Sequence, residues 1–84
     1  MISRKFDGNS NVCGKEIEKL RKQKHWSRAT LSNKLMMLGI DINYDGIYKI
    51  ENERRIVKDF ELAAIAKVLN TSENDLLFNF KNKL

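Results

Sequence analysis

The sequence of 84 residues contains no proline, one cysteine, Cys13, and one histidine, His25. A single cysteine cannot close a disulfide within the chain, and together with one histidine it does not supply the ligand set of a structural zinc site. The chain also lacks a glycine-rich phosphate loop and offers few of the side chains from which catalytic sites are built. We therefore expect no metal, no cofactor, no small-molecule ligand and no enzymatic activity.

Long apolar stretches are missing as well. No segment approaches the run of about 18 apolar residues that a transmembrane helix needs, and the opening residues 1–5 are too polar for a secretory signal. These absences predict a cytoplasmic protein with no membrane partner. The length leaves room for one small domain built around a single core.

The charge is basic and unevenly distributed. The chain has 16 Lys and Arg against 11 Asp and Glu, a net charge of +5. Residues 1–58 carry 13 of the basic and 7 of the acidic side chains, a net charge of +6, whereas residues 59–84 have a net charge of −1. Because the positive potential belongs to the first two thirds of the chain, nucleic acid is the leading class of partner.

Apolar residues recur at helical spacing throughout the chain, and no segment shows the alternation of a strand. With Ser27, Asn43 and Ser72 as N-caps, the pattern predicts an all-α bundle of five helices near 12–24, 27–39, 44–52, 59–69 and 72–77. We expect a flexible N-terminal arm over 1–11, one domain over 12–77 and a C-terminal tail over 78–84. The apolar side chains of residues 76–84 are equally compatible with intramolecular packing and with a dimer contact.

The order and spacing of several short segments resemble a known family. These segments are Ile17-Glu18-Lys19-Leu20-Arg21-Lys22, Trp26-Ser27-Arg28-Ala29-Thr30-Leu31, Gly46-Ile47-Tyr48-Lys49-Ile50-Glu51-Asn52 and Glu61-Leu62-Ala63-Ala64-Ile65-Ala66. Over about residues 12–77 the chain is similar to helix-turn-helix regulators of the XRE, Cro and phage-repressor type. The resemblance implies a compact lambda-repressor-like bundle in which the second and third helices form the helix-turn-helix.

The chain departs from the family pattern in two ways. The stretch between Leu35 and Ile47 is about five residues longer than in the shortest members, which predicts a longer second helix. Glu53 stands where relatives often have glycine, at the point where the chain leaves the third helix. This substitution is expected to cost a little stability or phosphate affinity.

The resemblance also implies which residues contact DNA. A short helix presented on the surface fits the major groove, and its exposed side chains read base edges. Carried over position by position, Tyr44, Asp45 and Lys49 are base-reading residues, with Gly46 and Tyr48 beside them. The residues expected at the phosphate backbone are Ser27 and Arg28 on one side and Asn52, Arg54, Arg55 and Lys58 on the other. Arg21 and Glu51 are expected to form a partly buried ion pair between the first and third helices.

The function predicted from the sequence is that of a transcriptional regulator, more specifically a repressor, that binds a double-stranded DNA operator as a homodimer. The homodimer is inferred because one small module buries too little DNA for tight binding. The alternative is a protein-interaction module, such as an antirepressor or antitoxin-like protein, which Asp45, Glu51 and Glu53 support. A continuous positive surface around the third helix would favour DNA, whereas acidic side chains that interrupt this surface would favour the alternative.

Overall fold

The computed structural model describes residues 6–84, so the first five residues of the expected arm lie outside the described part of the chain. In that part, the elements are α1 (Gly14–Gln23), α2 (Arg28–Met36), α3 (Tyr44–Glu51), α4 (Asp59–Val68), α5 (Glu73–Leu76) and α6 (Phe78–Lys81). The fold is all-α, as predicted, and the four-residue α6 adds a further turn of helix within the expected tail. No helix among residues 6–84 is long and apolar enough to cross a membrane.

Capping side chains set where three of the helices begin. The side chains of Ser27, Asn43 and Ser72 accept hydrogen bonds from the backbone N–H groups of Thr30, Gly46 and Asp75, at 3.0, 2.8 and 3.0 Å. Each bond satisfies one N–H group that has no partner within its own helix. Serine and asparagine at these positions therefore explain why α2, α3 and α5 start where they do.

The end of α2 differs from the expected longer helix. The helix stops at Met36, and Gly39 turns the chain with a φ of 80°, a conformation that glycine adopts without the steric cost of a side chain. The Ile40 N–H then bonds back to the Leu35 carbonyl at 3.0 Å, which closes the helix end. The additional residues are thus accommodated mainly in the connection between α2 and α3.

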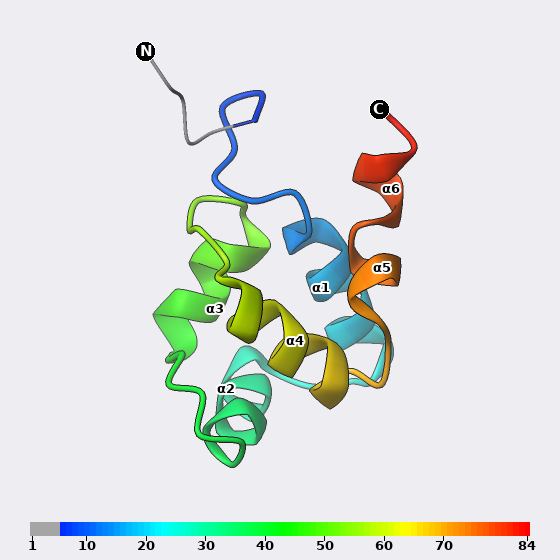
Figure 1. Cartoon of the computed structure of the whole chain (residues 1–84). Coiled ribbons are helices and arrows are strands. Elements are labelled where there is room, and N and C mark those ends of the chain that lie inside the picture. The colour runs from blue at the N-terminus through cyan, green and yellow to red at the C-terminus, as the bar shows by residue number, and fades with distance from the viewer. Residues whose placement is uncertain (1–5) are drawn as a thin grey trace.

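One apolar core joins the helices. Its fully buried aliphatic side chains come from α1 (Ile17), α2 (Leu31, Leu35), α3 (Ile47, Ile50), α4 (Ile65) and α5 (Leu76), together with Ile42 of the connection. Figure 1 shows α3 on one flank of the bundle and α5 and α6 on the opposite flank. The core therefore holds α3 from one side only and leaves its outer side to solvent.

Residues 6–11, expected to belong to a flexible arm, lie against the bundle. The Ser10 N–H donates to the Glu53 carbonyl at 2.7 Å, and the Phe6 ring meets the Phe80 ring edge to face at 4.9 Å. The side-chain amide of Asn11 donates to the carbonyls of Ile50 and Arg55 at 3.1 and 2.8 Å. Asn11 thereby ties the start of α1 to the end of α3.

Candidate nucleic-acid interface

The outer face of α3 is a small polar surface made by four side chains. Ile47 and Ile50 face the core, so Tyr44, Asp45, Tyr48 and Lys49 point outward at helical spacing. The two tyrosines are 54% and 40% exposed, so a ligand can reach both rings. The base-reading candidates other than Gly46 therefore lie together on one accessible face.

Gly46 has a different role. It is half-buried, and a Cβ atom at this position would come within 2.9 Å of Ile42 Cγ2. Such a contact is closer than carbon atoms tolerate, so the absence of a side chain lets α3 begin directly against the chain that leads into it. Gly46 contributes to the site by packing and presents no side chain to a ligand.

A buried ion pair fixes the end of α3 to α1. The guanidinium of Arg21 donates to Glu51 through Nε to Oε2 at 2.6 Å and through Nη2 to Oε1 at 3.1 Å. Arg21 Nη1 also donates to the Trp26 carbonyl at 2.7 Å, and Glu51 is completely buried. Because a buried carboxylate is costly without its donors, this two-pronged contact holds α3 in a defined orientation.

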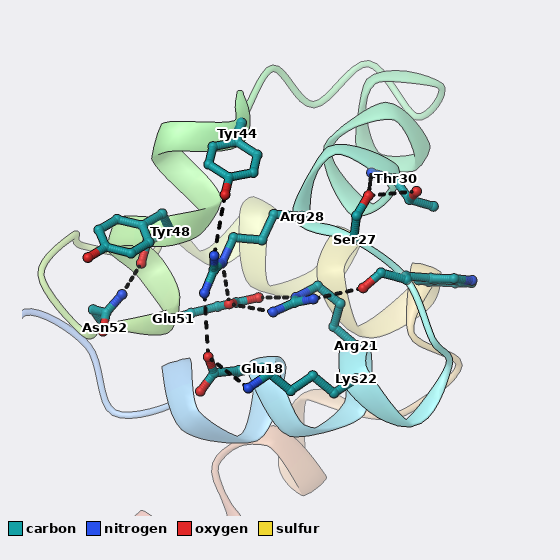
Figure 2. Close-up of polar contacts among 11 residues, drawn as sticks. Glu18, Arg21, Lys22, Ser27, Arg28, Thr30, Tyr44, Tyr48, Glu51 and Asn52 are labelled. Atoms are coloured by element: carbon teal, nitrogen blue, oxygen red, sulfur yellow. Dashed lines mark hydrogen bonds and ion pairs between the residues drawn. The ribbon is translucent and has the colours of Figure 1, made fainter.

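Arg28 belongs to the same network. Its Nε donates to Glu51 Oε1 at 2.8 Å, and its Nη2 lies 3.6 Å from Glu18 Oε2 of α1 (Figure 2). The bond to Glu51 is the main reason that the pKa of Arg28 is raised above its ordinary value. The guanidinium expected at a phosphate is thus engaged within the domain, and its side chain is only 22% exposed.

The two outward tyrosines frame this guanidinium. Arg28 Cζ lies 5.1 Å from the ring centroid of Tyr48 and 6.0 Å from that of Tyr44, within the range of a cation–π contact. Arg28 Nη1 also lies 3.5 Å from the Tyr44 hydroxyl. Figure 2 shows the guanidinium reaching toward this hydroxyl from the side of Glu51. Arg28 therefore links the buried carboxylate to the two aromatic rings on the exposed face of α3.

The remaining candidates for phosphate contact surround α3. Ser27 is exposed at the start of α2, Arg54 and Lys58 are exposed between α3 and α4, and Asn52 donates to the Tyr48 carbonyl at 2.9 Å. Arg55 differs because its Nη2 lies 3.1 Å from Glu61 Oε2 of α4. The structure thus leaves Arg54 and Lys58 as the most accessible of the expected basic contacts.

The acidic residues do not form a continuous negative surface here. Glu51 is buried between two arginines, and the half-buried Glu53 lies beside Gly14 at the start of α1. Glu53 has a φ of 60°, the left-handed conformation that glycine adopts at lower cost than glutamate. Asp45 remains exposed, 3.1 Å from the ammonium of Lys49. The face is therefore mixed in charge, with Asp45 as its single exposed carboxylate on α3.

Two residues that hold the site together, Glu18 in the arginine network and Asn11 outside it, are absent from the prediction made from the sequence. Glu18, which receives Arg28, reads in the sequence as one more charge on the outer face of an amphipathic helix. Asn11 lies in a polar stretch without periodicity, although its side chain accepts from the Gly14 N–H at 2.9 Å as well as donating to two carbonyls. The Asn-x-x-Gly spacing was the only available sign of a cap at the start of α1.

Within residues 6–84, no three His, Cys, Asp or Glu side chains are grouped so that they could hold a metal ion.

The comparison with protein families matches residues 17–76, more than two thirds of the chain, to the family described as Helix-turn-helix. No curated protein and no solved structure matched the chain. The matched residues run from α1 through α5 and include the buried ion pair and the exposed face of α3. The chain belongs to the helix-turn-helix family of DNA-binding regulators, of the XRE, Cro and phage-repressor type.

Proposed function

We propose that this protein is a transcriptional repressor that binds an operator in double-stranded DNA by placing α3 in the major groove. The observation that carries the proposal is the exposed face of α3, which consists of Tyr44, Asp45, Tyr48 and Lys49. The buried ion pair between Arg21 and Glu51 holds this helix in place on its core side. A helix held in a fixed orientation presents its side chains to base edges with little loss of conformational entropy.

Three of the four outward side chains suit a particular base contact. Lys49 can donate to the guanine edge, Asp45 can accept from the amino group of cytosine, and Tyr44 can contact a thymine methyl. The ion pair between Lys49 and Asp45 is exposed, so separating the two charges costs only about 0–1 kcal/mol. Lys49 and Asp45 can therefore each leave the ion pair and bind a base instead.

Contacts with the phosphate backbone of DNA supply affinity without sequence preference. Ser27 on one side of α3, and Asn52, Arg54 and Lys58 on the other, are the proposed phosphate contacts. Arg28 acts mainly as a positioning residue, because its guanidinium already bonds to Glu51 and frames the tyrosines. Arg55 reaches a phosphate only by exchanging its contact with Glu61.

Binding of two half-sites by a homodimer completes the proposal, because a single module of this size buries a modest area on DNA.

The test is selection of genomic fragments that bind the protein, followed by fluorescence anisotropy on the enriched sequence from low to physiological salt. We expect saturable binding that weakens steeply with salt and a relaxed base preference in Lys49→Ala. The matched control is Lys83→Ala, which removes the same charge from an exposed position outside the interface.

The alternative is a protein-interaction module on the same scaffold. It is favoured by the exposed carboxylate of Asp45 and by the engagement of Arg28 and Arg55 with acidic side chains of the domain itself. In that case no sequence would be enriched, and the weak binding to DNA that remained would be the same in Lys49→Ala as in the parent. That result would overturn the operator-binding proposal.

A further inference from the structure

An apolar hollow lies between the C-terminal ends of α2 and α4. It has a volume of about 300 Å³ and is lined by Trp26, Lys34, Met37, Leu38, Lys67 and Val68. No residue of α3 or of the connection from α3 to α4 contributes to it. The hollow is therefore built from elements other than the proposed DNA-reading surface.

The turn after α2 places apolar side chains in solvent where folding does not require them. Met37 is 85% exposed and Leu38 is 44% exposed, whereas Leu35 one turn earlier already fills the core. Gly39 closes this turn through its backbone conformation, so the turn itself does not depend on the largely exposed side chain of Met37. Apolar side chains grouped on the surface in this way are typical of binding sites.

The charges around the hollow are of one sign. The ammonium groups of Lys34 and Lys24 lie 4.7 and 5.3 Å from the centroid of the Trp26 ring, and Lys67 contributes a third positive charge to the lining. No carboxylate lines the hollow, and none of the three lysines forms an ion pair within residues 6–84. The site thus combines an apolar floor with positively charged edges.

We propose that this hollow docks an acidic segment of a partner protein. A large apolar side chain of the segment enters beside Trp26 and Met37, and its flanking carboxylates face Lys34 and Lys67. A second copy of this chain seated face to face would bring lysines against lysines, which costs free energy. A DNA backbone would satisfy the lysines but leave the apolar floor in contact with water.

The experiment selects binding peptides from a random library displayed on phage, with the full chain immobilised. Enriched peptides are then titrated against Lys34→Glu/Lys67→Glu and against Met37→Ser, which changes one largely exposed side chain and so leaves folding intact. We expect the enriched peptides to combine carboxylates with a large apolar residue and to bind either variant about tenfold more weakly. The control Lys19→Glu/Lys83→Glu makes the same change in net charge on other surfaces and should bind as the parent does.

Three results would overturn the proposal. The first is enrichment of peptides that bind the parent and both variants equally, because the hollow would then not be their site. The second is self-association of the parent that Met37→Ser abolishes, which would assign the hollow to a second copy. The third is equal dependence on these residues in binding to vesicles of anionic lipid, which would assign it to a membrane surface. Operator binding involves α3 and is measured separately, so its failure is distinguishable from each of these.

Discussion

The guanidinium of Arg28 bonds to Glu51, approaches Glu18 and faces two tyrosine rings. We propose that Arg28 positions those rings. The substitution Arg28→Lys keeps the charge but removes the planar guanidinium, which bonds to Glu51 and stacks on the rings at the same time. We expect this variant to discriminate about tenfold less between the operator and a sequence altered at the bases near Tyr44 and Tyr48. The salt dependence of binding should stay unchanged because no charge is lost.

Anisotropy titrations of both duplexes at several salt concentrations check this prediction. Arg54→Lys is the control, since Arg54 is exposed between α3 and α4 and is proposed to contact a phosphate. A lysine can replace an arginine as a point charge at a phosphate, so this variant should keep its base preference. Full discrimination in Arg28→Lys would instead assign Arg28 to a phosphate contact.

Cys13 is 3% exposed, and its burial raises the pKa of the thiol to about 11. The folded state therefore favours the neutral thiol, whereas in the unfolded chain the thiol has its ordinary pKa of 9.0. The stability that Cys13 contributes is complete below pH 9 and is lost as the pH rises toward 11, by about 2 kcal/mol near pH 10.5. Urea unfolding of the parent and of Cys13→Ala at pH 8 and near pH 10.5 measures this difference. Equal pH dependence in the two proteins would contradict it.

The close approach of α1 and α3 depends on Gly14. A Cβ atom at this position would collide with the Ile50 carbonyl and come within 3.0 Å of the Glu51 carbonyl. Because both are backbone atoms, α1 must shift to relieve the collision, and we expect Gly14→Ala to destabilise the fold by about 2–3 kcal/mol. The shift also moves Arg21 relative to Glu51, so operator affinity should fall with stability.

Gly39→Ala is the informative comparison for this prediction. Gly39 has a φ of 80° but open space around its Cα, so alanine there pays only a conformational cost of about 1 kcal/mol. Thermal and urea unfolding of both variants separate a steric cost from a conformational one. A loss of stability in Gly14→Ala no greater than that in Gly39→Ala would mean that α1 and α3 separate easily.

The elements themselves could be predicted well from the sequence, because periodicity and N-caps are local signals. Ser27, Asn43 and Ser72 begin helices as expected, and the contact between Arg21 and Glu51 is present at the positions that the family resemblance indicated. The partners of Arg28 could not be predicted in this way. They depend on how α1, α2 and α3 are brought together, and no spacing within one helix encodes that arrangement.

The charge distribution of the molecule and the small reading surface of α3 both bear on how DNA would be bound. The entire net positive charge lies in residues 1–58, which contain α1 to α3, and α3 alone can read only a few base pairs. A homodimer doubles both the phosphate contacts and the bases read. Its two copies of α3 must then meet the same side of the duplex, about one helical turn apart.

Inserting five base pairs between the half-sites of the operator turns one half-site to the opposite side of the duplex, since a turn takes about 10.5 base pairs. We expect the affinity of the protein for this duplex to fall to that for a single half-site, because only one protomer can reach its bases. Anisotropy with the inserted duplex, with a single half-site and with a duplex whose spacer is changed in sequence but not in length measures the effect. The altered spacer should retain most of the parent affinity. Equal binding at both spacings would show that each copy binds independently, and the proposed homodimer on DNA would have to be abandoned.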